Sequence, residues 1–260
     1  MELVDTHCHL QFEKLEERLS KVIEDAAAAG VTRLICIGTN LKDSQKAADI
    51  AAANGNVWAS VGVHPHDAAG FLQDGSAEST LARLYKLPKI VAIGEIGLDF
   101  YKNYSPKADQ EKLLRKQLEL SADAGLPYVF HVRDAWDYFW SIFDDYNITK
   151  GVIHSFSADA VRLDQALNRG LHIALNGIMT FIEDKAQLEA ARIVPKDKLV
   201  LETDAPFLTP APMRTELCEP KHTAATAAFL AKLRGESLDE LASLTTANAV
   251  KLFGLEGSDR

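Results

Sequence analysis

The residues best suited to chemistry are histidines and carboxylates that stand at or just after the ends of short apolar runs. Six of them recur in this way along the chain: His7, His9, Glu95, His131, His154 and Asp204. Imidazole and carboxylate groups bind Zn, Mn, Fe, Co or Ni, and a set with two carboxylates also admits Mg. If these six side chains meet in space, the sequence predicts a site for divalent metal ions.

Spacing supports this prediction. His7 and His9 are two positions apart, which puts both side chains on one face of a strand and allows both to reach one cation. Taken alone, a His-x-His pair is more often a pair of surface or core histidines. Glu95 is the best candidate to bridge two ions, because a carboxylate has an oxygen for each ion and an imidazole does not.

A second pair of carboxylates ends the last apolar run. Glu202 and Asp204 have the same spacing of two positions, so we expect them to share a face. Asp204 could bind a metal and orient or deprotonate the attacking water, and Glu202 could hold a ligand histidine by a hydrogen bond. The alternative for Asp204 is an Asx-type turn before Pro206. His172 and His222 are expected to be structural.

Short apolar, β-branched runs alternate with longer segments of helical spacing along the chain. The predicted strands are 2–8, 33–38, 57–63, 90–95, 127–131, 151–155, 171–176 and 198–203. The predicted helices are 15–29, 42–53, 107–124, 135–143, 159–169, 183–192, 223–234 and 238–253. This alternation predicts a parallel sheet, and eight strands are the number that closes a barrel.

The rival fold is an open, doubly wound sheet with a glycine-rich phosphate loop after its first strand. The sequence contains neither GxGxxG nor GxxxxGK[ST]. It therefore predicts a single-domain (β/α)8 TIM-type barrel over residues 1–260. The carboxyl ends of parallel barrel strands share one rim, where barrel enzymes carry their active sites. The six ligand-type residues, and His64 after the third predicted strand, should converge there.

Composition limits the classes of function. The chain has 260 residues and a formal net charge of −9, which argues against gripping long duplex DNA but not against an enzyme that holds a few nucleotides. Its three cysteines, Cys8, Cys36 and Cys218, lack CxxC spacing and indicate a reducing compartment. With no secretory signal or membrane span expected, we predict a cytoplasmic protein, by default a monomer.

Six motifs together resemble the TatD-type metal-dependent deoxyribonucleases, which belong to the amidohydrolase-like barrels. They are DTHCHL at 5–10, GVHPHD at 62–67, IGEIGLDF at 93–100, HVRDA at 131–135, HSFS at 154–157 and LETDAP at 201–206. The resemblance runs from residue 3 to about residue 253. It implies hydrolysis of phosphodiester bonds in DNA, as 3′-to-5′ exonuclease trimming and sometimes as cleavage at abasic sites.

The resemblance also implies roles for individual residues. Two divalent metal ions (Mg, Mn or Zn) are expected, one held by His7, His9 and Asp204 and the other by His131 and His154. Glu95 is expected to bridge them. Two further residues, His64 and Arg133, match positions that meet the phosphate of the substrate.

This chain departs from the family pattern before Glu219 and Pro220. Leu217 and Cys218 stand where Arg or Lys and then Asn are common. The change removes a phosphate or base contact near the mouth of the site, which weakens the case for DNA as the substrate. A second departure, HSFSA at 154–158, leaves the metal-binding residues unchanged.

We expect two-metal hydrolysis of a phosphodiester, with Asp204 positioning the attacking water and taking its proton. The net negative charge suits single-stranded or frayed 3′ ends of DNA better than long duplex. An alternative keeps the metals and changes the bond, as in an amidohydrolase or esterase that acts on a small molecule or on aminoacyl-tRNA. A scaffold that binds metal or nucleic acid without catalysis is a third interpretation, and the complete ligand set argues against it.

Overall fold

The computed structural model describes residues 1–255, and the last five residues of the predicted domain, 256–260, lie outside the described residues. All eight predicted strands are present and form one parallel sheet in sequence order. The strands are β1 (Leu3–Cys8), β2 (Val31–Ile37), β3 (Val57–Val61), β4 (Ile90–Asp99), β5 (Tyr128–Arg133), β6 (Gly151–Ile153), β7 (His172–Leu175) and β8 (Leu199–Leu201). The fold is the predicted (β/α)8 barrel.

The first and last strands nearly close the barrel. Beyond the end of β8, Asp204 N donates to His7 O at 2.8 Å and His9 N donates to Ala205 O at 2.7 Å. Cys8 and Ala205 form a parallel bridge. These contacts bring the last functional motif of the sequence beside the first.

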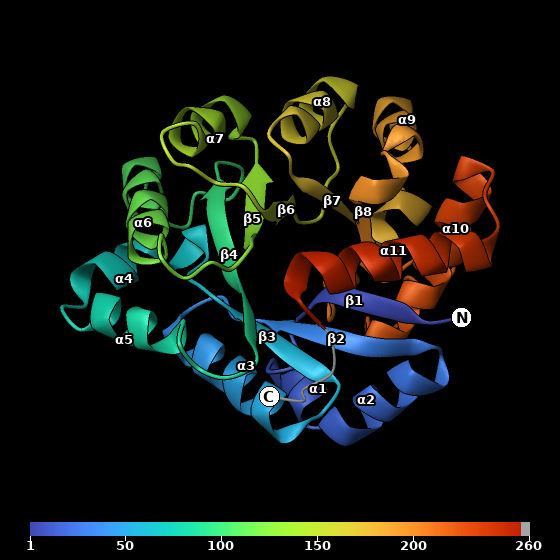
Figure 1. The fold of residues 1–260 in the computed structure, drawn as a ribbon, viewed down its shortest axis with the longest axis horizontal. Helices are drawn as coiled ribbons and strands as arrows, with labels where there is room; N and C mark the ends of the chain where they lie inside the picture. Colours follow the sequence, from blue (N-terminus) through green and yellow to red (C-terminus); the bar gives the residue numbers. More distant parts are fainter. Residues whose placement is uncertain (256–260) are drawn as a thin grey trace.

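Helices surround the strands in a ring (Figure 1). They are α1 (Glu13–Glu16), α2 (Leu19–Ala28), α3 (Leu41–Ala53), α4 (Ala68–Gln73), α5 (Ala77–Leu84), α6 (Lys107–Leu120), α7 (Trp136–Phe143), α8 (Ala160–Asn168), α9 (Lys185–Ile193), α10 (Thr223–Arg234) and α11 (Leu238–Phe253). The predicted helix 15–29 is divided, because Arg18 leaves the helical conformation with φ −127° and ψ 24°. The short helices α4 and α5 were not predicted, since the stretch between them, 74–76, interrupts their apolar spacing.

Strand β4 is longer than predicted, and the expectation that it ends at Glu95 is wrong. Its pairing with β5 continues to Asp99 opposite Arg133. Gly97 permits this close pairing, because it has a φ of 149° and a Cβ there would lie 1.9 Å from His131 O. The strand carries its side chains farther toward the rim than the sequence indicated.

The amino-terminal end of the barrel is filled by apolar side chains. Leu252 and Phe253 of α11 and the following Leu255 pack with buried strand residues such as Val4 and Val200. Figure 1 shows α11 crossing the strands. Within residues 1–255, none of the helices combines the length and apolarity that a membrane span requires. The carboxyl ends of the strands remain available for a site.

Candidate metal centre

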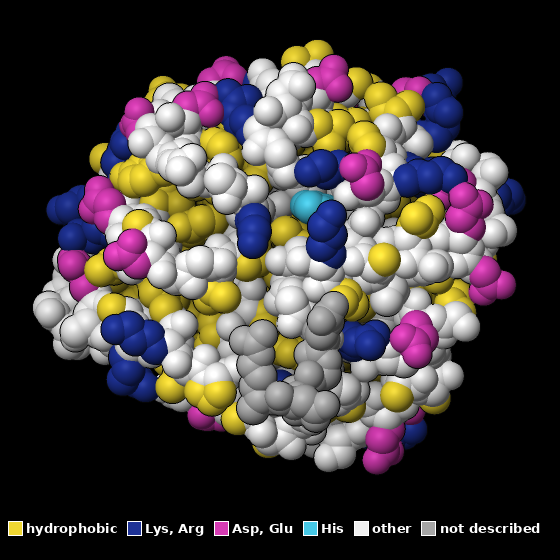
Figure 2. All heavy atoms as spheres, in the orientation of Figure 1, with side chains coloured by type: hydrophobic (Ala, Val, Ile, Leu, Met, Phe, Trp, Pro, Cys, Tyr) yellow, Lys and Arg dark blue, Asp and Glu magenta, His cyan; other side chains and the backbone are white. Residues whose placement is uncertain are grey.

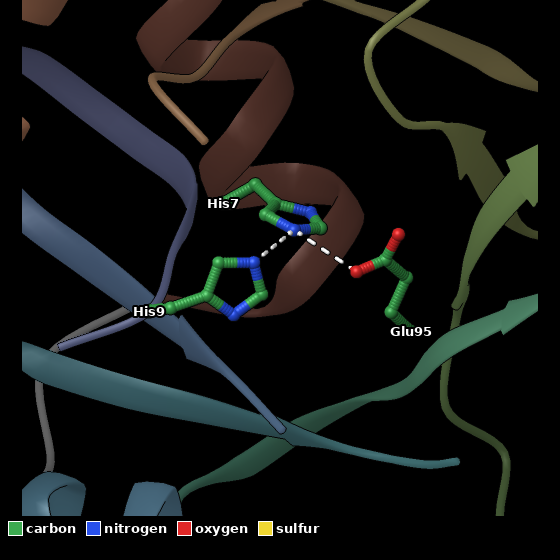
Figure 3. Close-up of side chains that lie close together, drawn as sticks. All are labelled: His7, His9 and Glu95. Atoms are coloured by element: carbon green, nitrogen blue, oxygen red, sulfur yellow. Dashed lines mark hydrogen bonds and ion pairs between the residues drawn. The ribbon is translucent and has the colours of Figure 1, made fainter. Parts of the chain in front are cut away.

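Two histidines from β1 and its following loop face carboxylates from β4 and from the segment after β8. His7 Nε2 lies 3.3 Å from His9 Nε2 and 3.4 Å from Glu95 Oε2. Figure 3 shows His7 and His9 at the end of β1 converging with Glu95 of β4. Asp204 Oδ1 completes the group, at 3.3 Å from His9 Nε2 and 3.6 Å from His7 Nε2.

Glu95 joins this group to a second one. Its Oε1 lies 2.8 Å from His131 Nδ1, 3.6 Å from His64 Nε2 and 3.7 Å from His154 Nε2. The side chain is nearly buried, so its two oxygens are directed at imidazoles rather than at bulk water. One carboxylate is therefore shared by two clusters of nitrogen atoms.

The histidines are oriented by protein acceptors behind them. His9 Nδ1 donates to Ile37 O at 2.9 Å, which leaves Nε2 with a lone pair toward the cluster. His154 Nδ1 lies 3.0 Å from Glu202 Oε1, and its Nε2 points toward Glu95. An acceptor behind one ring nitrogen is the usual arrangement for a histidine that binds metal through the other.

These residues fit a divalent cation. The ligand atoms of His7, His9 and Glu95 lie within 4.8 Å of one another, and so do those of the group His64, Glu95 and His131. In the neutral ring that donates from Nδ1, His9 Nε2 carries a lone pair, and its neighbours are another imidazole nitrogen and a carboxylate oxygen. A bound cation would satisfy these facing lone pairs.

Burial and charge act in opposite directions on the acidic and basic groups. Burial alone would raise the pKa of Glu95, but the imidazoles around it outweigh burial and hold that pKa well below its usual range. Burial also opposes a charge on His154, but the carboxylates of Glu202 and Glu95 raise its pKa to about 10. The centre is therefore built to keep its carboxylates ionised.

Glu202 and Asp204 lie on different sides of His154, whereas the sequence led us to expect them on one face. Glu202 is buried and its Oε1 accepts from Ser155 N at 2.8 Å and Asn176 Nδ2 at 3.0 Å. Asp204 has a φ of 62°, outside regular strand geometry, and its side chain is 16% exposed toward the pocket. The period of a strand does not apply here because β8 ends at Leu201.

A pocket of about 470 Å³ opens above these groups. His9, Glu95, His131, His154 and Asp204 line it, together with the two residues predicted to meet the substrate, His64 and Arg133. His7 and Glu202 lie buried behind its wall. The structure thus brings together all of the predicted site residues.

Several polar residues that line the pocket were missed from the sequence, among them His66 and Asp99, which lie beside His131. His66 Nε2 lies 2.9 Å from Asp99 Oδ2, and the same oxygen is 3.2 Å from His131 Nε2. Burial opposes ionisation of Asp99, but these contacts prevail and lower its pKa. Two signals were available, since His66 follows His64 by two positions and Asp99 follows Glu95 by four on the same strand face.

The segment that departs from the family pattern lies beside the pocket rather than in it. Cys218 is fully buried, and Glu219 is paired with Arg18 and with Lys221, whose Nζ is 2.8 Å away. Leu217 lines a separate hollow beside Pro206. The departure therefore leaves the histidines and carboxylates of the candidate centre in place.

Comparisons with known proteins identify the family. The family model described as TatD related DNase matches residues 4–254. The metal-dependent hydrolase YabD of Bacillus subtilis is 33% identical, covering 96% of this chain and 98% of its own length. The 3′-5′ ssDNA/RNA exonuclease TatD of Citrobacter rodentium is 36% identical, covering 90% and 91%.

A solved structure agrees with these sequence matches. YJJV, a TatD homolog from Escherichia coli K12, superposes with a TM-score of 0.91 at 27% identity and covers 98% of each chain. The matches confirm both the resemblance in the motifs and the prediction of a metal-dependent hydrolase of the nuclease type. The chain belongs to the TatD related DNase family.

Proposed function

We propose that this protein is a 3′-to-5′ exonuclease that removes nucleotides from single-stranded or frayed ends of DNA. The observation that carries the proposal is Glu95, a buried carboxylate shared by two histidine clusters at the base of an open pocket. The name of the Citrobacter relative, a 3′-5′ ssDNA/RNA exonuclease, supports the polarity and the single-stranded substrate.

The centre would hold two divalent ions, Mg, Mn or Zn. One would be held by His7, His9 and Asp204, the other by His131 and His154, with Glu95 between them. When bound, the metal supplies Lewis acidity toward water and toward the phosphate oxygens. The acceptor groups behind His9 and His154 support these assignments, because they orient each ring so that its Nε2 points into the cluster.

Other side chains would handle the proton and the charge of the phosphate. Asp204 is the partly exposed carboxylate of the cluster, so it can orient the attacking water and accept its proton. Burial holds the pKa of His64 well below 6.5, and its Nδ1 accepts from His66 N at 3.1 Å. A neutral His64 therefore carries its proton on Nε2 and can donate to a phosphate oxygen, as can the Arg133 guanidinium.

The domain organisation, oligomeric state and cellular location are also part of the proposal. We propose that residues 1–260 act as one domain, as a monomer, in the cytoplasm. The three cysteines are free and buried, in keeping with a reducing compartment. Abasic-site cleavage would use the same centre, since it also breaks the backbone of DNA.

The proposal is tested with a single-stranded oligonucleotide labelled at its 5′ end, incubated with Mg²⁺, Mn²⁺, Zn²⁺ or EDTA. We expect a ladder of products shortened from the 3′ end, abolished by EDTA and by Glu95→Gln. Glu189→Gln is the matched control, because Glu189 is an exposed carboxylate paired with Arg192. If protein shown to contain metal releases nothing, the substrate assignment fails and an amide or aminoacyl ester becomes the bond to test.

A further inference from the structure

One wall of the pocket is aromatic and reaches from the metal centre to solvent. Phe207 lines the pocket and leaves 51% of its surface exposed, an unusual exposure for so large an apolar ring. Phe12 lines the same wall and is half-buried. Neither ring has a role in binding metal or moving protons.

The two rings are held against a metal-binding histidine. The Phe12 ring stacks on His9 with centroids 4.7 Å apart and an interplanar angle of 11°. Phe207 meets Phe12 edge to face at 6.1 Å and His9 at 6.4 Å. Its backbone is anchored by Phe207 N, which donates to Asp204 O at 2.9 Å. A flat group attached to a phosphate at the centre would therefore lie within reach of these rings.

The lining of the pocket also includes two cationic side chains, Arg133 and Lys102. The Arg133 guanidinium lies 3.9 Å from the Tyr101 ring centroid, and Lys102 Nζ lies 5.5 Å from the same ring. A substrate with a planar apolar part and an anionic part matches this lining, with its anion toward Arg133 and its plane toward Phe207.

We infer that Phe207, supported by Phe12, forms a stacking subsite for the base of the terminal nucleotide. This inference rests on the proposed exonuclease function and names how its substrate is held. Stacking on an aromatic ring accepts any base, because every base has a π-face. It requires an unpaired base, so the subsite selects single-stranded ends over paired ones.

A binding experiment tests the subsite directly. The probe is a single-stranded oligonucleotide with 2-aminopurine as its 3′-terminal base and a phosphorothioate at the last linkage to slow hydrolysis, with Mg²⁺ present. Stacking quenches 2-aminopurine, so we expect the wild-type protein to quench it. Phe207→Leu should weaken binding about tenfold and lose most of the quenching. Tyr146→Leu is the control, since Tyr146 is half-buried and contacts Glu119 outside the pocket.

A second measurement, the rate of nucleotide release, distinguishes binding of the base at the subsite from hydrolysis at the metal centre. Wild-type release of a normal 3′-terminal nucleotide should exceed release of an abasic one about tenfold, and Phe207→Leu should remove this difference. Quenching without release from any substrate would support the subsite and reject the exonuclease. Equal release rates from normal and abasic 3′ termini, together with unchanged affinity in Phe207→Leu, would overturn the subsite. The exonuclease proposal would stand.

Discussion

At the scale of single residues, Glu202 orients the imidazole ring of His154, a candidate metal ligand. Its Oε1 accepts from two other donors and lies 3.0 Å from His154 Nδ1. The carboxylate therefore sets which nitrogen of His154 faces Glu95. Substituting a residue that orients a metal ligand lowers metal affinity by about 10–100-fold.

We therefore expect Glu202→Gln to bind Mn²⁺ about 10–100-fold more weakly than wild type while remaining folded. The amide keeps the shape of the side chain but loses the charge that orients His154. Titration calorimetry with Mn²⁺ measures the affinity, and Glu189→Gln serves as the exposed control. Equal Kd values for wild type and Glu202→Gln would refute the orienting role.

Arg133 is expected to contact the phosphate of the substrate. Its guanidinium is exposed in the pocket and lies over Tyr101, ready to meet an anion. Removing a charge-assisted hydrogen bond should lower kcat/KM by about 10–100-fold in Arg133→Gln. Steady-state kinetics at two salt concentrations checks this, with Arg162→Gln as control because Arg162 is paired with Asp137. A loss of equal size in both variants would contradict a specific phosphate contact.

At the scale of elements, the join between β1 and the end of β8 is held by a buried clamp. Asp5 accepts from Thr203 N at 3.0 Å, from Thr203 Oγ1 at 2.6 Å and from His7 N at 3.2 Å. Burial raises the pKa of Asp5 to about 8 despite these bonds. The clamp places His7 and Asp204 against each other across the closure of the barrel.

Asp5→Ala should lower the free energy of unfolding by about 2–3 kcal/mol, because it leaves buried donors without an acceptor. Thr203→Val removes only the hydroxyl and should cost about 1 kcal/mol. Urea unfolding of metal-free protein measures both. If the two variants are equally stable, the hydrogen bonds of the Asp5 carboxylate to the backbone do not hold the closure.

The elements were largely predictable because β-branched apolar runs and helical spacing alternate clearly in this chain. The boundaries of the strands and helices were less predictable. Strand β4 continues through Gly97 only because β5 lies close enough to pair, a fact of tertiary structure. Asp99 and His66 were missed for the same reason, since their significance depends on a contact with each other and with His131.

At the scale of the whole molecule, the charge balance bears on how DNA could be held. The chain carries a net charge of −9. On the face shown in Figure 2, acidic and basic side chains of the described residues are interspersed, with no continuous basic stripe. A net negative charge gives little help in holding long duplex DNA, so we expect recognition to depend on the pocket and its Arg133 and Lys102.

The pH dependence of the free energy of unfolding should include a contribution from His172. This residue lies far from the candidate metal centre, at the start of β7. Burial, with a contribution from Lys198, lowers its pKa to about 4, against about 6.5 in an unfolded chain. The unfolded chain binds more protons between these values, so the free energy of unfolding falls as pH falls from about 6.5 toward 4. Because the ring is partly exposed, we expect a contribution of at most about 2 kcal/mol.

His172→Gln should therefore lose less stability than wild type between pH 7 and pH 5, since glutamine does not titrate. Urea unfolding of metal-free protein at the two pH values gives the comparison. An identical pH dependence in the two proteins would show that His172 is not held neutral by the fold.

We propose that the histidine and carboxylate centre holds the metal on which nucleotide release depends. The most direct measurement strips one preparation of metal, returns Mn²⁺ in steps and records bound metal and release from a single-stranded oligonucleotide together. We predict that release is absent from stripped protein and rises with occupancy, and that Glu95→Gln neither binds metal normally nor recovers activity. Release that persists in stripped protein, or its absence at full occupancy, would contradict the claim.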